Sequence, residues 1–265
     1  MARRGEGGDT SAPASSCQPG IAVSSWQQLK RFTPARVALG RTGASLPTSA
    51  LLEFGLAQAK ARDAVYTKLD IDELIARLKP LGWGCVQVRS AARDRAEYLR
   101  RPDLGRCLDP EGAALTSSSE AIELLFVVAD GLSARAAQTH AIPLLEAVKN
   151  RLGDWRVGPV VIAEQARVAI GDDIGERFRA RIVVMLIGER PGLSAPDSLG
   201  AYITYNPRPG CHDAQRNCIS NIRPEGLGYQ MAAHRLVHLL ESARRLRLTG
   251  IALKDDSPEL PATLT

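Results

Sequence analysis

The sequence comprises 265 residues, which is enough for one large domain or two small ones. Its 45% hydrophobic and 24% charged residues are ordinary for a soluble globular protein, and no apolar run is long enough to predict a transmembrane helix. The net charge of +5 comes from 34 basic and 29 acidic residues interspersed along the chain, which favours a solvated surface over a nucleic-acid interface.

The first part of the chain is predicted to be irregular and then helical. Residues 1–23 contain little that packs and lack the apolar run of a secretory signal, so we expect a disordered leader there. Pro47-Thr48-Ser49 predicts the start of an amphipathic helix, and a second helix is predicted over 70–78. Residues 24–82 are therefore predicted to form a helical N-terminal region.

Strands and helices alternate from residue 83 onward. The predicted strands are apolar runs at 85–88, 123–129, 160–163, 182–187 and 202–205, and the predicted helices cover 93–101, 134–152 and 228–246. Fully apolar strands that alternate with helices are typical of a parallel sheet covered on both faces. The predicted fold class is α/β: a Rossmann-like, mainly parallel sheet over 83–265 with helices on both faces, preceded by the helical N-terminal region.

Ligands of such folds bind beyond the carboxyl ends of the strands. Two predicted loops, 130–133 and 188–194, place glycines and polar groups just past buried strands. Glu189 follows the strand at 182–187 and is placed to accept hydrogen bonds from an amide- or hydroxyl-rich ligand. A salt bridge to the adjacent Arg190 is the structural alternative for this carboxylate.

Several catalytic motifs are missing. The sequence holds no Gly-x-Gly-x-x-Gly, no P-loop, no Gly-x-Ser-x-Gly and no HExxH zinc motif. These absences weigh against a self-sufficient α/β enzyme that binds a nucleotide or sugar phosphate. That enzyme and a basic nucleic-acid-binding module stay as alternative hypotheses, and no catalytic residue is predicted.

The candidate metal ligands do not form a complete set. Cys211, His212 and Cys218 are predicted to share a loop, but a structural zinc site takes four ligands. His234 and His238 stand one helical turn apart without a carboxylate between them. We therefore predict no metal-ligating residue, and the odd number of five cysteines indicates a reducing cytoplasm.

Five stretches together resemble a known family. They are FTPARVALGRTG at 32–43, PTSALL at 47–52, RVAIGDDIGE at 167–176, GERPGLS at 188–194 and NCISNI at 217–222. In this order and spacing, over roughly residues 24–253, the chain resembles the small (light) subunit of ethanolamine ammonia-lyase.

The resemblance implies a function shared between two subunits. The family is adenosylcobalamin-dependent and converts ethanolamine to acetaldehyde and ammonia by radical chemistry. Activity requires a large subunit with a TIM-barrel active site, which mainly binds the ethanolamine. In this interpretation residues 24–82 are an arm that contacts the large subunit, and 83–265 form a Rossmann-like cobalamin-binding domain, with no nucleic-acid or membrane partner.

The resemblance also carries three cofactor contacts onto this chain. Val168 matches an apolar contact at the corrin periphery, Glu189 matches an acceptor for carboxamide groups, and Cys218 matches a small, soft residue that permits close approach. The chain lacks an Asp-x-His-x-x-Gly motif, and the family keeps the cofactor's own dimethylbenzimidazole on cobalt, so no protein ligand to the metal is implied.

The expected location is the cytoplasm, with the inside of a bacterial microcompartment as a further option. Some family members begin with an amphipathic helix that directs them into such a compartment. Residues 1–20 show no apolar stripe of that kind, which weighs against an address on this chain, and the large subunit could carry it instead.

Overall fold

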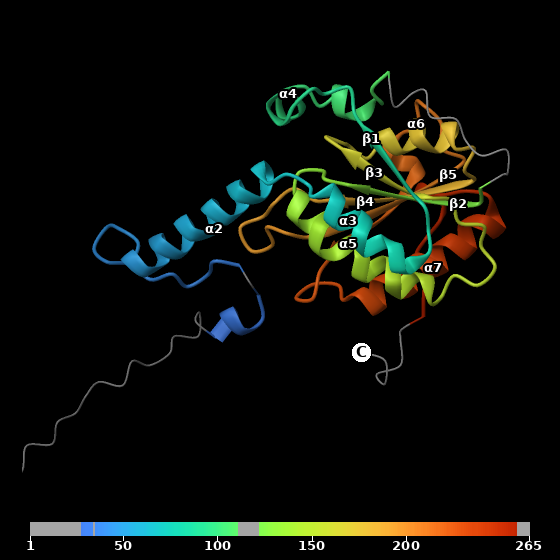
Figure 1. Cartoon of the computed structure of the whole chain (residues 1–265). Coiled ribbons are helices and arrows are strands. Elements are labelled where there is room, and N and C mark those ends of the chain that lie inside the picture. Colours follow the sequence, from blue (N-terminus) through green and yellow to red (C-terminus); the bar gives the residue numbers. More distant parts are fainter. Residues whose placement is uncertain (1–27, 34, 111–121, 259–265) are drawn as a thin grey trace, which may run out of the picture. The chain divides into compact units, whose positions relative to one another are not determined.

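The computed structural model describes residues 28–33, 35–110 and 122–258 (Figure 1). Its contacts divide the chain into two units, Met1–Ala50 and Leu51–Thr265. The described part of the first unit holds a short 3₁₀ turn, Leu29–Arg31, and an isolated bridge between Thr42 and Ser45. The predicted leader at 1–23 lies outside the described residues.

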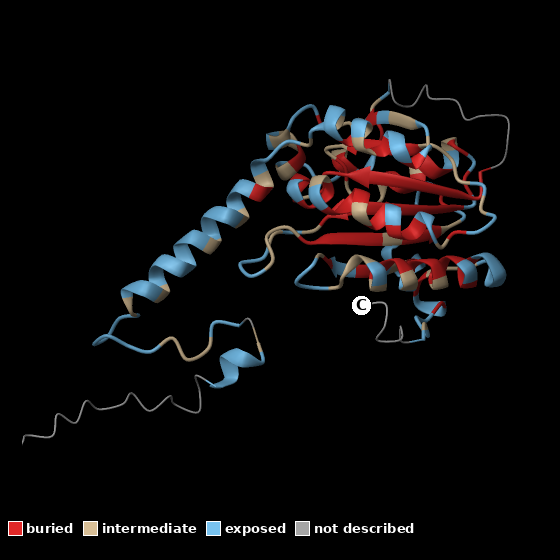
Figure 2. Cartoon of the chain, turned by 60° about the horizontal axis from the view of Figure 1, so that its bottom comes forward, coloured by how far each residue is buried: buried red, intermediate tan, exposed pale blue. Residues whose placement is uncertain are grey.

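Two helices precede the sheet, as predicted. Helix α2 spans Thr48–Tyr66, and Ala64 is its one buried residue, so Figure 2 shows it exposed along nearly its whole length. Helix α3 spans Ile71–Leu78, and its N-cap Asp70 accepts the backbone N–H of Glu73 at 3.0 Å. Unlike α2, α3 buries leucines in the core of the second unit.

A six-stranded sheet forms the centre of the second unit, in the order β1-β3-β2-β4-β5-β6. The strands are β1 Cys85–Arg89, β2 Leu124–Ala129, β3 Val160–Glu164, β4 Ile182–Gly188, β5 Leu199–Tyr205 and β6 Arg216–Ile222. The first four strands in this order pair in parallel, β5 is antiparallel to β4, and β6 is antiparallel to β5. The predicted α/β class is confirmed, whereas β6 was not predicted.

Helices cover both faces of the sheet (Figure 1). Helices α3, α5 (Ala134–Lys149) and α7 (Tyr229–Leu246) pack against one face, and α6 (Ile170–Arg177) packs against the other. Every residue of β2 and β4 is buried, which explains their continuous apolar sequences. Helix α4 (Arg95–Arg100) follows β1 and buries Tyr98. No described helix is long and apolar enough to cross a bilayer.

The two predicted rim loops meet at the carboxyl ends of β2 and β4. The backbone N–H of Leu132 donates to the carbonyl of Gly188 at 3.0 Å. A Cβ on Gly188 would lie 2.6 Å from the carbonyl oxygen of Asp130 and closer still to that of Ser133, so only glycine fits this crossing. Ser133 caps α5 by accepting from the N–H of Ala136. The contact between the two loops fixes the carboxyl ends of β2 and β4, and Glu189 directly follows the end of β4.

Candidate functional site

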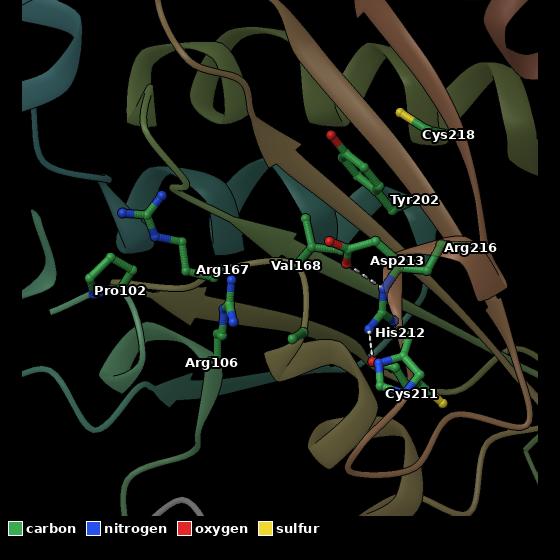
Figure 3. A pocket seen from close by; sticks show the side chains of 11 residues that line it. Pro102, Arg106, Arg167, Val168, Tyr202, Cys211, His212, Asp213, Arg216 and Cys218 are labelled. Carbon is green, nitrogen blue, oxygen red and sulfur yellow. Dashed lines mark hydrogen bonds and ion pairs between the residues drawn. The ribbon is translucent and has the colours of Figure 1, made fainter. Parts of the chain in front are cut away.

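A cavity of about 390 Å³ lies on the α6 face of the sheet, near the start of α6 (Figure 3). Its walls come from three parts of the chain: the segment after α4, the turn that opens α6, and β5 and β6 with the loop that joins them. The lining residues are Pro102, Arg106, Arg167, Val168, Ala169, Tyr202, Cys211, His212, Asp213, Arg216 and Cys218. Val168 and Cys218, predicted from separate stretches of sequence, therefore line the same cavity.

Strand pairing brings Tyr202 and Cys218 together. They are register partners on the antiparallel β5 and β6, and both side chains face the cavity (Figure 3). Burial raises the pKa of Tyr202, and the nearby Cys218 and Glu189 raise it further. Desolvation likewise raises the pKa of the Cys218 thiol above its ordinary value. Both groups are therefore neutral near pH 7, and Cys218 offers a thiol rather than a thiolate.

Glu189 lies beside this cavity and is not part of its lining. Its Oε2 accepts the backbone N–H of Asn221 at 3.2 Å. A Cβ on Gly200 would come within 3.1 Å of both Glu189 Oε1 and the ring of Tyr202, so the carboxylate lies over Gly200 next to that ring. Glu189 forms no ion pair with any described residue, which does not support the alternative of a salt bridge to Arg190.

One wall of the cavity depends on a buried ion pair that sequence reasoning missed. Arg216 binds Asp172 of α6 through two hydrogen bonds of 2.6 and 2.7 Å, and both side chains are only 3% exposed. The same guanidinium donates to Thr204 Oγ1 and to the carbonyl of Cys211, each at 3.0 Å. Arg216 thus fastens β6 to α6, to β5 and to the loop before β6.

The opposite wall carries two further arginines that were not predicted, Arg106 and Arg167 (Figure 3). Arg167 stacks on the buried ring of Tyr98, with its guanidinium carbon 4.4 Å from the ring centroid. Its position directly before Val168 in the family-like stretch 167–176 was the available signal.

Comparisons with known proteins agree with the sequence resemblance. The family model described as "Ethanolamine ammonia-lyase light chain (EutC)" matches residues 23–254. The ethanolamine ammonia-lyase small subunit of Azotobacter vinelandii is 55% identical over 239 residues, which is 88% of each chain. That of Ralstonia nicotianae is 51% identical over 248 residues, covering 91% of this chain and 92% of its own. That of Pseudomonas fluorescens strain Pf0-1 is 53% identical over 239 residues, 88% of this chain and 87% of its own.

The chain belongs to the ethanolamine ammonia-lyase light-chain family.

A buried carboxylate links the ends of β2 and β3. Asp130 follows β2 and accepts the backbone N–H groups of Gln165 at 2.9 Å and Ala166 at 3.0 Å, just after β3. Arg95 pairs with the same carboxylate at 3.3 Å. Burial raises the pKa of Asp130 to about 6 despite these partners. Asp130 thereby holds the turn that leads to Arg167 and Val168.

The candidate cysteine and histidine ligands form no metal site within the described residues. Cys211 and His212 lie in the loop before β6, but Cys218 lies within β6, so the prediction that all three share a loop is wrong. His234 and His238 on α7 contact the carbonyl of Pro258 and the carboxylate of Asp256. Within the described ranges, no three His, Cys, Asp or Glu side chains are arranged to hold a metal ion, and the described cysteines are free thiols.

Proposed function

We propose that this chain is the small subunit of an adenosylcobalamin-dependent ethanolamine ammonia-lyase and completes the cofactor site against a large subunit. The family membership supports the lyase assignment over the two alternatives, since the relatives are ethanolamine ammonia-lyase small subunits. Their name implies a large-subunit partner, which in this proposal carries the TIM-barrel active site and binds ethanolamine. The proposed location is the cytoplasm, with the interior of a bacterial microcompartment as a further option.

The observation that carries the proposal is the joint placement of Val168 and Cys218 in one cavity with Glu189 at its edge. A cobalamin presents an apolar corrin rim and peripheral carboxamides, so it needs apolar contact and hydrogen-bond acceptors. Val168 supplies the first, and the Glu189 carboxylate, without an ion pair among the described residues, supplies the second. The neutral Cys218 thiol gives a small, polarisable surface. Val168, Glu189 and Cys218 therefore match the groups that a cobalamin presents.

The role of this chain is to bind and orient rather than to react. When bound, adenosylcobalamin supplies the radical chemistry that turns ethanolamine into acetaldehyde and ammonia. Val168, Glu189 and Cys218 hold one side of the cofactor, and no residue of this chain is proposed to ligate cobalt or to move a substrate proton. The exposed leucines of α2, Leu51, Leu52 and Leu56, support the proposal that the region 24–82 contacts the large subunit.

Reconstitution tests the proposed function. This chain, a cognate large subunit and their mixture are each given adenosylcobalamin and ethanolamine, and acetaldehyde is measured. We expect acetaldehyde only from the mixture of the two subunits. Product from this chain alone would overturn the shared-site proposal, and inactivity of every mixture of demonstrably folded subunits would overturn the assignment.

A variant of Glu189 tests the site itself. Glu189→Ala removes a carboxylate whose one side-chain hydrogen bond within the described structure comes from the backbone N–H of Asn221, so the chain should stay folded. Loss of a charge-assisted hydrogen bond to the cofactor should weaken cobalamin retention by the two-subunit complex roughly tenfold or more. Retention is measured by absorbance after gel filtration, with Glu241→Ala on the exposed surface of α7 as the matched control. Unchanged retention in Glu189→Ala would remove this residue from the site.

A further inference from the structure

The cavity contains two kinds of arginine. Arg216 pairs with the buried carboxylate of Asp172 and, at 3.5 Å, with Asp213, an exposed carboxylate that also lines the cavity. Arg106 and Arg167 form no ion pair with any described residue. Figure 3 shows these two on the wall opposite His212 and Arg216. Two cations on one wall without a carboxylate partner are an electrostatic match for an anion, and guanidinium groups suit phosphate in particular because they donate in a planar fork.

Arg167 is held in place before any ligand arrives. Its guanidinium stacks on Tyr98, which is itself completely buried and hydrogen-bonded to the carbonyl of Ala166 at 3.0 Å. Its backbone N–H donates to Gly105 at 2.7 Å, and a Cβ on Gly105 would lie 2.9 Å from Arg167 Cγ. The Nε of Arg167 is buried and has no hydrogen-bond partner within the described part of the chain. A side chain that stacking and packing already hold in place loses little conformational entropy when a ligand binds.

Backbone donors add to the positive wall. The N–H groups of Val168 and Ala169, directly before α6, make no hydrogen bond to any described residue. They lie at the positive end of the helix dipole. The acidic residues of the first turn do not cancel this field, since Asp172 pairs with Arg216 and Asp173 pairs with Arg177 at 2.9 Å.

We propose that Arg106 and Arg167, with these two N–H groups, bind the phosphodiester of the cobalamin nucleotide loop. This inference rests on the proposed function and adds an anion subsite to it. The peripheral carboxamides of a cobalamin are neutral, so the phosphodiester is the group that two unpaired arginines fit. The division of the site follows: Glu189 accepts from carboxamide N–H groups, and the Arg106–Arg167 wall donates to the phosphate.

The test compares two corrinoids on the two-subunit complex. Cyanocobalamin carries the nucleotide loop, and cobinamide lacks it together with its phosphate. Loss of a charge-assisted contact should raise the cyanocobalamin Kd of Arg167→Ala by about tenfold to a hundredfold and leave the cobinamide Kd unchanged. Arg106→Ala, at an exposed position, should also raise only the cyanocobalamin Kd. It provides the test if Arg167→Ala does not fold. Arg235→Ala on α7 removes the same charge from an exposed position on the opposite face of the sheet and should change neither Kd.

The outcomes separate the inference from the function on which it rests. An equal loss for both corrinoids in both arginine variants would show a structural role and overturn the phosphate assignment. No loss for either corrinoid would overturn it as well. A wild-type complex that binds neither corrinoid would instead refute the proposed cobalamin function itself. Selective loss of cyanocobalamin, with a weaker dependence of its Kd on salt than in the wild type, is the supporting result.

Discussion

Removing one half of the Asp172–Arg216 pair should destabilise the chain strongly. In Asp172→Asn the side chain keeps its shape but loses its charge, so the hydrogen bonds of 2.6 and 2.7 Å are reduced to one, from the guanidinium to the amide oxygen. The Arg216 charge, 3% exposed, is then left without its buried counter-ion. Breaking a buried pair on one side costs roughly 3–5 kcal/mol, and the retained bond places the expected loss in the free energy of unfolding near 3 kcal/mol. Such a loss is a large share of the roughly 5–15 kcal/mol that stabilise a typical domain.

Chemical denaturation of the full chain measures this loss, and an exposed pair gives the control. Arg101 and Asp103 approach to the same 2.7 Å, but their side chains are 60% and 58% exposed, so Asp103→Asn should leave the free energy of unfolding nearly unchanged. Because Arg216 also holds the carbonyl of Cys211, Asp172→Asn should weaken cobalamin retention by the complex. Adding Arg216→Met should restore part of the stability, since no unpaired charge then remains. If Asp172→Asn costs no more than Asp103→Asn, burial does not decide the strength of this pair.

Two further predictions concern the strand ends beside the cavity. Burial raises the pKa of Asp130 to about 6 from its ordinary 3.8, so the folded chain binds this proton more tightly than the unfolded chain. The resulting stabilisation, about 3 kcal/mol in full, is present below about pH 4 and is lost as the pH rises through 6. The unfolding free energy of the wild type relative to Asp130→Asn should therefore increase from pH 7 to pH 4, and a difference that is flat with pH would contradict the burial argument. Gly188→Ala should cost about 3 kcal/mol or more, because its Cβ would overlap two carbonyl groups. Gly55→Ala, with nothing within 4 Å, is the matched control and should be neutral or stabilising by thermal denaturation.

The strands that are buried on both faces could be predicted, because such strands have continuous apolar sequences. Strands β2 and β4 are of this kind. Strand β6 was missed because its sequence, Arg-Asn-Cys-Ile-Ser-Asn-Ile, buries only Arg216, Ile219 and Ile222 and has the polar composition of a loop. Its strand conformation comes from pairing with β5, a non-local interaction that local pattern does not reveal.

Helix α6 was missed for a different reason. Its sequence contains Gly171, Gly175 and two aspartates, which are poor helix formers. The glycines are required by packing, since a Cβ at Gly171 would lie 2.7 Å from Met185 and one at Gly175 would lie 2.6 Å from Val183. Tertiary contact with β4 therefore overrides helix propensity.

The family resemblance predicted Val168, Glu189 and Cys218 as cofactor contacts. Only the structure shows which arginines of the cavity are paired with a carboxylate and which are not. The chain holds 34 lysines and arginines, and their spacing in the sequence does not show which carboxylate each one meets. Asp172 and Arg216 are 44 residues apart and become partners because α6 packs beside β5 and β6. The charge of an arginine that pairs with a buried carboxylate is largely offset, so it attracts an anionic ligand only weakly. The charge of an arginine that stacks on a ring and forms no ion pair in the described structure is not offset, so it can attract an anionic ligand. By this criterion Arg216 shapes the wall of the cavity, whereas Arg167 is the arginine proposed to bind a ligand.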